Sequence, residues 1–174
     1  LLGSPWLQQR QSLPCSLSLP LAPAGPGLPE LLPRPGSIWM IETSGRNHLE
    51  PLELCSLESA ALHNPNKSVH FLLTYPVQEP EGNLSNLMDI YPNIIAQFLN
   101  LDTLLLSSPL AELWQSGKVH ASPYPVSHLS DLIRYLLLHR WGGVYLDTDV
   151  ISLKAVPEAK IFTAIEWAPL DRLA

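Results

Sequence analysis

Two acidic residues, Asp147 and Asp149, follow the short apolar run 144–146 and are separated by one threonine. Residues two apart in an extended strand face the same way, so the two carboxylates are expected to point together. Neighbouring carboxylates repel each other, and a hard divalent cation bound by oxygen atoms would compensate their charge. Ligands of open α/β sheets bind at the carboxyl ends of the strands. The pair therefore predicts a site for Mg²⁺ or Mn²⁺ that in turn holds a phosphate group.

A simpler interpretation of the same aspartates stays open at this point. They could belong to a polar loop after a strand, with both side chains solvated. The pattern Asp-x-Asp is frequent by chance, so the spacing alone does not choose between the two interpretations.

Asp131 and Arg134 lie three residues apart upstream, and this spacing places them on one face of a helix. One interpretation is a surface ion pair, usually worth under about 1 kcal/mol. The other is a binding pair, in which Asp131 accepts hydrogen bonds from sugar hydroxyls and Arg134 stays close to phosphate or sugar oxygens. Gly142 and Gly143 are expected to end this helix, because glycine tolerates the left-handed backbone of a helix end. Both charged pairs would then lie at one end of the sheet.

The segments that must position these residues alternate between strand and helix patterns. Short apolar runs predict strands, and apolar residues at helical spacing predict helices. Strands are expected at 38–41, 69–74, 94–101 and 144–146, helices at 52–63, 109–114 and 127–139, and a loop at 78–86. This order indicates the α/β class, with a mostly parallel sheet and helical crossovers.

The first 36 residues differ from the rest, since they hold eight of the eighteen prolines. Proline at this density blocks helices and central strands, so residues 1–36 are expected to form an extended or disordered arm. A single domain is expected to cover residues 37–174. Two cysteines, Cys15 and Cys55, leave open one disulfide or two separate thiols.

The bulk composition excludes some classes of function. The net charge is −6 without a basic cluster, which argues against binding nucleic acid. No apolar run is long enough to span a membrane. Two glycosylation triplets, Asn66-Lys67-Ser68 and Asn83-Leu84-Ser85, matter only if the chain enters the secretory route.

The run Ser127–Lys154 resembles the signature of glycosyltransferases with a DXD sugar-nucleotide motif. That signature consists of Ser-Asp, an Arg three residues after the Asp, Gly-Gly, and then Tyr-x-Asp-x-Asp. Within that family the run is similar to the branch of lactosylceramide 4-α-galactosyltransferases and α-1,4-N-acetylglucosaminyltransferases. Three further stretches resemble this branch in the same order: Ile41–Ser44, Cys55–Ala61 and Pro109–Trp114.

The resemblance implies a GT-A-like fold, a divalent cation that is usually Mn²⁺, a UDP-sugar donor and transfer with retention at the anomeric carbon. Asp147 and Asp149 match the metal-binding pair, with Asp149 as the more direct ligand and Asp147 also close to the nucleotide. Asp131 and Arg134 match residues that hold the donor sugar, and they are the candidate catalytic pair.

The same resemblance implies that Glu42, Thr43 and Tyr145 lie near the nucleotide, and that Cys15 and Cys55 form a disulfide. The sugar would be galactose or an N-acetylhexosamine, moved in α-1,4 linkage to a glycolipid or glycan acceptor. The family members act on the lumenal side of the Golgi membrane, which here would require an anchor outside this sequence.

The sequence departs from the family after Lys154, where no further motif matches. The family has a long C-terminal half, so the chain is expected to be truncated at its C-terminus. One alternative is therefore an inactive fragment that binds a UDP-sugar without transferring it. Another is a metal-dependent phosphatase of the haloacid dehalogenase type, since those enzymes also end a strand with Asp-x-Asp. No carboxylate is assigned as a covalent nucleophile, and front-face displacement is the favoured mechanism.

Overall fold

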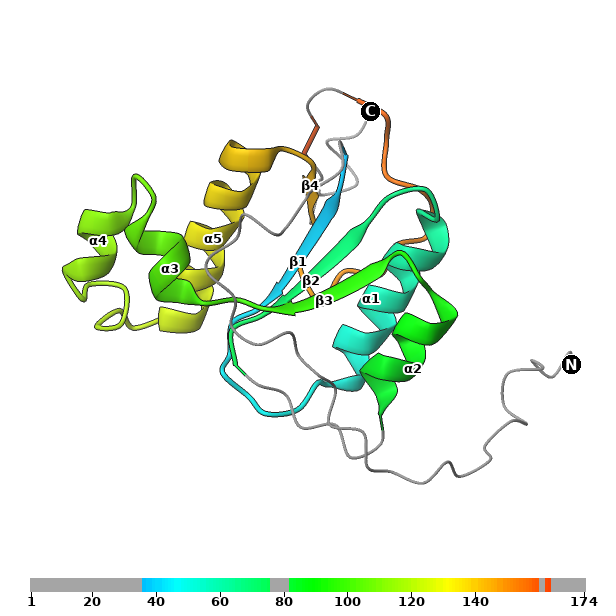
Figure 1. Cartoon of the computed structure of the whole chain (residues 1–174), viewed down its shortest axis with the longest axis horizontal. Helices are drawn as coiled ribbons and strands as arrows, with labels where there is room; N and C mark the ends of the chain where they lie inside the picture. The colour runs from blue at the N-terminus through cyan, green and yellow to red at the C-terminus, as the bar shows by residue number, and fades with distance from the viewer. Residues whose placement is uncertain (1–35, 76–81, 160–161, 164–174) are drawn as a thin grey trace, which may run out of the picture.

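The computed structural model describes residues 36–75, 82–159 and 162–163. Strands and helices alternate along this part of the chain (Figure 1). They are β1 (Ile38–Glu42), α1 (Pro51–His63), β2 (Val69–Leu73), α2 (Asn83–Ile90), β3 (Ile94–Phe98), α3 (Leu101–Leu106), α4 (Ala111–Gln115), α5 (Pro125–Trp141) and β4 (Val144–Tyr145). The predicted arm, apart from Gly36, lies outside the described residues, and so does Cys15.

The four strands form one sheet in the order β3-β2-β1-β4, and each neighbouring pair is parallel. Ile38 at the start of β1 lies opposite both Val69 of β2 and Val144 of β4. Parallel neighbours need a crossover, and the intervening helices supply it. The predicted α/β class with a mostly parallel sheet and helical crossovers is confirmed.

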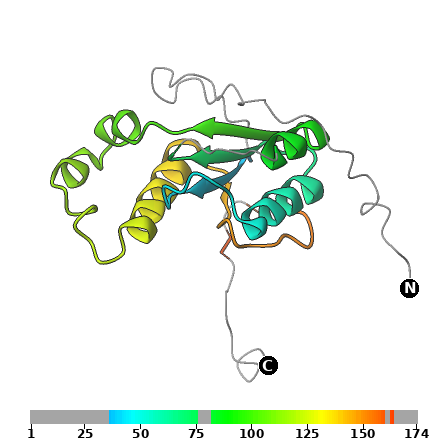
Figure 2. The ribbon, with the colours of Figure 1, turned by 90° about the horizontal axis from the view of Figure 1, so that it is seen from below.

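Helices cover both faces of this sheet, as Figures 1 and 2 show: α1 and α2 lie on one side, and α3 to α5 on the other. The alternation of β1 explains the two layers. Ile38 and Met40 join the cluster that packs against α1, whereas Trp39 and Ile41 join the cluster that packs against α5. All five residues of β1 are buried, as expected for a strand that is covered on both faces.

The helix α2 corrects one prediction, because it begins inside the segment that was expected to be a loop up to Asn86. Gly82 has a left-handed backbone with φ of 61°, and its carbonyl accepts a hydrogen bond from Asn86 N at 2.9 Å. Leu84 is buried, and Leu87 and Met88 pack against the same core. The apolar spacing of three and four residues makes this polar-looking segment a helix.

The helix α3 corrects a second prediction, which continued the third strand to Leu101. The strand ends at Phe98, and the side chain of Asn100 accepts a hydrogen bond from Thr103 N at 2.9 Å. Asparagine is among the preferred N-cap residues, because its side chain satisfies a backbone N–H that the helix leaves unpaired. The short helix α4 also begins two residues later than the predicted helix 109–114.

The glycine pair ends α5 as predicted, and it also brings β4 against β1. Gly142 and Gly143 have positive φ angles of 68° and 91°. A side chain on Gly143 would collide with the backbone of Ser37, so only glycine fits this approach. Val144 N then donates to Ser37 O at 2.9 Å, and Trp39 Nε1 donates to Gly142 O at 2.8 Å.

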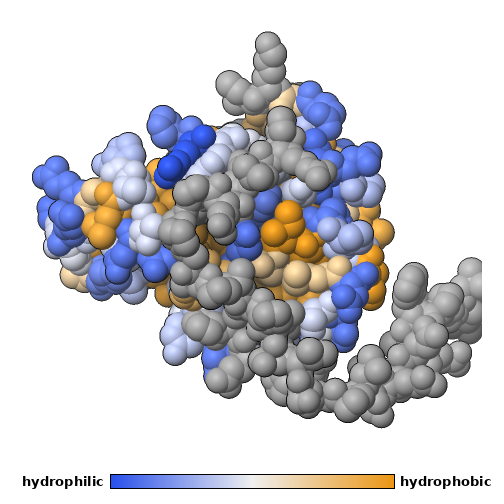
Figure 3. Space-filling model, in the orientation of Figure 1, coloured by the Kyte–Doolittle hydropathy of each residue, from blue (hydrophilic) through white to orange (hydrophobic). Residues whose placement is uncertain are grey.

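The surface in the orientation of Figure 1 mixes hydrophilic and hydrophobic residues, with hydrophobic ones gathered in the middle of this face, over the sheet (Figure 3). None of the described helices has the length and apolar character needed to cross a bilayer.

Candidate functional site

The sheet has a topological switch point between β1 and β4. From β1 the chain passes through α1 to β2 and then through α2 to β3, always on the same side of β1. The next crossover, through α3 to α5, instead places β4 on the opposite side of β1. The connections that leave β1 and β4 therefore diverge, and a crevice opens at the carboxyl ends of these two strands.

A pocket of about 750 Å³ lies at this crevice. Ligand sites for small molecules usually measure about 300–1,000 Å³. The ends of β1 and β4, the β1–α1 loop and the start of α5 supply its walls. The predicted site residues that line it are Glu42, Thr43, Arg134, Tyr145, Asp147 and Asp149. Asp131 is the one predicted site residue that does not.

Arg134 joins the two charged pairs. Its Nη2 atom lies 2.9 Å from Asp147 Oδ1 and 3.4 Å from Asp131 Oδ1. The guanidinium also lies over the ring of Tyr145, at 4.5 Å from the ring centroid. The Tyr145 hydroxyl pairs with Ser130 Oγ at 3.0 Å, which fixes the ring in turn. Asp131 thus acts behind Arg134, while Arg134 reaches the pocket.

The charges around Arg134 explain why its pKa is raised. Burial opposes the charge on Arg134, but Tyr145, Asp147 and Asp131 outweigh burial and raise the pKa of the guanidinium. Burial raises the pKa of Tyr145, and the charge of Asp147 adds to this, against the opposing effects of Ser130 and Arg134. Tyr145 is therefore a neutral phenol and Arg134 a fixed cation at physiological pH.

The backbone of the aspartate pair differs from the prediction. The strand ends at Tyr145, and Val150 N donates to Asp147 O at 3.2 Å, which closes a turn. The expectation that Asp147 and Asp149 share one face of an extended strand is therefore wrong. A strand continues only where a neighbour pairs with it, and β4 pairs with β1 at two positions only. Both aspartates still line the pocket, because the turn lies at its edge.

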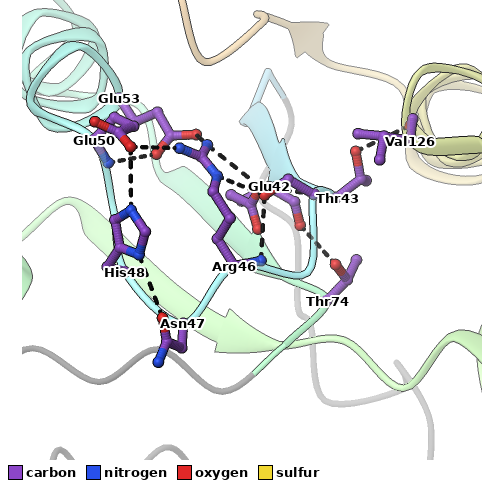
Figure 4. A network of polar contacts seen from close by, with 10 residues as sticks. Glu42, Thr43, Arg46, Asn47, His48, Glu50, Glu53, Thr74 and Val126 are labelled. Atoms are coloured by element: carbon purple, nitrogen blue, oxygen red, sulfur yellow. Dashed lines mark hydrogen bonds and ion pairs between the residues drawn. The ribbon is translucent and has the colours of Figure 1, made fainter. Parts of the chain in front are cut away.

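The β1–α1 loop closes the other side of the pocket with a network of ion pairs (Figure 4). Glu42 is 3% exposed, and its Oε1 atom accepts a hydrogen bond from Ser44 N at 2.7 Å. Arg46 lies among three carboxylates: its guanidinium nitrogens are 2.6 Å from Glu53, 3.0 Å from Glu50 and 3.8 Å from Glu42. An isolated ion pair at the surface contributes little to stability, but a network of several charges can hold a loop in one conformation. The three ion pairs of Arg46 therefore stabilise the β1–α1 loop.

Thr43 connects this loop to the start of α5. Its Oγ1 atom donates to Val126 O at 3.2 Å (Figure 4). On the other flank, the carbonyl of Glu42 accepts hydrogen bonds from both the N and the Oγ1 of Thr74. The two residues predicted to lie near the nucleotide are thus part of a wall that is tied to α5 and to β2.

Sequence reasoning missed Arg46, Glu50 and Glu53, which also line the pocket. The two glutamates carry a local signal: Glu50 precedes a proline at the helix start, and Glu53 follows three residues later. Glu53 Oε2 accepts a hydrogen bond from Glu50 N at 2.7 Å, which is half of a capping box. Arg46 carries no such signal, because its carboxylate partners belong to the end of β1 and the start of α1, and no sequence motif connects them.

The lining contains five carboxylates and two arginines, an excess of negative charge. An anionic diphosphate would be repelled here unless a cation accompanied it. Among the described residues no group of three or more His, Cys, Asp or Glu side chains could hold a metal. Mg²⁺, however, is usually bound by one or two carboxylates together with substrate phosphates and water. Asp147 and Asp149 fit this mode of binding.

The fold and the pocket define an α/β protein with a carboxylate-rich pocket at the switch point of its sheet. The family model described as "Glycosyltransferase sugar-binding region containing DXD motif" matches residues 51–166. The chain therefore belongs to this family of glycosyltransferases, and the resemblance drawn from the sequence is confirmed.

The chain is similar in sequence to several glycosyltransferases. The chain is 36% identical to lactosylceramide 4-alpha-galactosyltransferase of Homo sapiens, over 82% of this chain and 40% of that protein. It is 35% identical to the protein of the same name from Mus musculus, over 87% and 42%. It is 30% identical to alpha-1,4-N-acetylglucosaminyltransferase of Homo sapiens, over 86% and 46%. The chain thus spans less than half the length of these relatives.

One solved structure, PaToxG Glycosyltransferase, is similar with a TM-score of 0.49 and 18% identity, over 69% of this chain and 44% of that chain.

Proposed function

We propose that this chain carries the donor site of a UDP-sugar-dependent glycosyltransferase that uses Mn²⁺ or Mg²⁺. The observation that supports this most directly is the convergence of Asp147, Asp149 and Arg134 on one pocket at the switch point of the sheet. The chain's membership of the DXD family gives this geometry its chemical meaning.

Each residue has a role in this proposal. Asp147 and Asp149 would hold the cation, which supplies positive charge against the leaving diphosphate. Arg134 keeps the Asp147 carboxylate in place and offers donor N–H groups to sugar or phosphate oxygens. The guanidinium of Arg134 stacks on the ring of Tyr145 and forms an ion pair with Asp131, and both contacts keep it in position.

The nucleotide would lie against the end of β1. Glu42 and Thr43 form this wall, and Glu42 Oε2 has no hydrogen-bond partner among the described residues although it is buried. A buried carboxylate oxygen without a partner is costly, and a hydroxyl or N–H group of a bound ligand would satisfy it. This supports the placement of a polar ligand group beside Glu42.

For the reaction we propose transfer of galactose or an N-acetylhexosamine to a glycolipid or glycan in α-1,4 linkage, with retention at the anomeric carbon. The names of the relatives support the sugar class and the linkage. The ion-paired carboxylates of the β1–α1 loop are engaged with Arg46, so we assign no covalent nucleophile and favour front-face displacement.

For the cellular setting we propose the lumenal side of the Golgi membrane, with residues 37–174 forming the donor-binding domain. A disulfide between Cys15 and Cys55 would suit that compartment. Cys55 is exposed on α1, so its thiol is accessible to such a partner.

The test is calorimetry of UDP and several UDP-sugars, with and without Mn²⁺. We expect binding that needs Mn²⁺, and Asp149→Asn should abolish it while the circular dichroism spectrum stays the same. Asp89→Asn on the exposed end of α2 makes the same charge change away from the pocket and should bind like the wild type. Binding of UDP by Asp149→Asn at wild-type affinity would refute the proposal.

A transfer assay with lactosylceramide-like acceptors separates the active enzyme from a fragment that binds without catalysing. UDP binding without transfer would identify a binding fragment. The phosphatase alternative predicts instead a phosphoryl group trapped on Asp147, and the family match favours the transferase over it.

A further inference from the structure

The residues after the aspartate turn are held by side chains of α1 and of its C-cap residue, Asn64, rather than by strand pairing. We call residues 150–156 the strap. Ser59 Oγ accepts a hydrogen bond from Ser152 N at 2.9 Å. Near the end of the strap, Asn64 Oδ1 accepts one from Val156 N at 2.9 Å. The strap has no regular secondary structure, and the backbone of an irregular segment needs such partners to be satisfied.

Ser56 holds the start of the strap, where it meets the turn. Its Oγ atom donates to Val150 O at 2.6 Å and lies 3.4 Å from Asp147 O. Val150 N also closes the turn onto Asp147 O, so one serine hydroxyl contacts both ends of the turn. Ser56 is fully buried, which makes its hydrogen bond part of the protein interior.

The two serines act together because Ser59 is also tied to Ser56. Ser59 Oγ donates to Ser56 O at 2.8 Å while it accepts from Ser152 N. Residues three apart share one face of a helix, so this face of α1 presents two hydroxyls to the strap. Arg134 meanwhile fixes the Asp147 side chain from the opposite side of the turn. The backbone and the side chain of Asp147 are thus held by different elements.

We propose that Ser56 and Ser59 are positioning residues for the metal-binding aspartates: they anchor the strap so that Asp147 and Asp149 face the pocket before any cation binds. Ligands held in place in advance bind a cation more tightly than ligands that must first be ordered. This proposal rests on the proposed function, because it assigns the two aspartates to a cation that accompanies the nucleotide.

The test uses two substitutions of the same shape. Ser59→Thr keeps the hydroxyl, whereas Ser59→Val replaces it by a methyl group. In the full chain without metal, we expect faster amide exchange at Ser152 in Ser59→Val than in Ser59→Thr. The Kd of UDP in the presence of Mn²⁺ should rise about three- to tenfold in Ser59→Val and stay near the wild-type value in Ser59→Thr. Ser56→Ala should weaken UDP binding in the same direction.

A control separates positioning from a general loss of stability. Asn100→Ala removes the N-cap of α3, away from the strap, and should lower the melting temperature of the chain. It should leave the Kd of UDP unchanged. Equal weakening by Asn100→Ala would overturn the proposal, and so would unchanged amide exchange at Ser152 in Ser59→Val.

The remaining outcomes distinguish the two proposals. Unchanged UDP binding in Ser59→Val, in a wild-type chain that does bind UDP with Mn²⁺, would reject the positioning role alone. A wild-type chain that binds no UDP with Mn²⁺ would reject the proposed function, and the positioning role would fall with it.

Discussion

Replacing Arg134 by glutamine should change the affinities for metal and for donor in opposite directions. The guanidinium lies 2.9 Å from Asp147 Oδ1 and is therefore already a cation at one of the two metal-binding carboxylates. A divalent cation on the same carboxylate would meet its repulsion. The donor, in contrast, would lose the N–H groups that Arg134 offers to its oxygens. We expect Arg134→Gln to bind Mn²⁺ alone more tightly and UDP-sugar with Mn²⁺ more weakly.

The size of the first effect follows from Coulomb's law. A metal bound to Asp147 at about 2.1 Å would lie within about 5 Å of the guanidinium nitrogen. Charges of two and one at that distance repel by about 1.7 kcal/mol in a medium like water. Both side chains are about one-third exposed, so salt screening reduces this to about 1 kcal/mol. The Kd of Mn²⁺ should therefore fall about fivefold.

The assay is a titration of Mn²⁺ followed by the electron paramagnetic resonance signal of the free ion, first without and then with a UDP-sugar. Arg140→Gln removes the same charge at the end of α5, where Arg140 stacks on Trp141 outside the pocket lining. It should leave both affinities unchanged. Weaker binding of Mn²⁺ alone by Arg134→Gln would refute the predicted direction, since the hold of Arg134 on the Asp147 carboxylate would then favour the metal more than its charge repels it.

Two further predictions concern stability. Burial lowers the pKa of His70 to about 4, below its ordinary value of 6.5. The contribution of the neutral His70 to the free energy of unfolding is therefore fully present above pH 6.5 and is lost as the pH falls towards 4. His70→Phe should remove up to about 3 kcal/mol of this pH dependence, measured by urea unfolding at several pH values, and an unchanged slope would contradict the assignment. Gly142→Ala, with open space around the new methyl group, should destabilise the chain by about 1–3 kcal/mol through its backbone conformation alone. Gly143→Ala should destabilise the chain more than Gly142→Ala, because its methyl group also collides with the backbone of Ser37. Equal melting temperatures for the two glycine variants would show that the close approach is not rigid.

The sequence alone determined the elements whose patterns are local. The apolar spacing of residues 127–139 predicted α5, and the apolar runs predicted the start of each strand correctly. The same local logic failed where a few polar residues concealed a helix, as in α2, or where a cap fell inside an apolar run, as at Asn100. Leu84, Leu87 and Met88 of α2 pack against a core that other elements supply, whereas the cap at Asn100 is a local signal that the surrounding apolar run conceals.

The candidate site was predictable in part. The aspartate pair and the Asp131–Arg134 pair carry spacing that points to charge chemistry, and their resemblance to the DXD family connected them. The direct contact of Arg134 with Asp147 was not predictable, because the two residues are thirteen positions apart and meet only after Gly142 and Gly143 reverse the chain.

The tertiary structure alone decided which loops form the pocket wall and what holds the aspartates. The order β3-β2-β1-β4 places the end of β1 beside the end of β4, and so brings the Arg46 network opposite the aspartate turn. It also places Ser56 under that turn, at a separation of 91 residues from Asp147. Local propensity reflects the few residues within one turn or one strand, whereas sheet order reflects the summed packing of both faces. For this reason the sequence specified the chemical groups of the site, and the fold determined their arrangement.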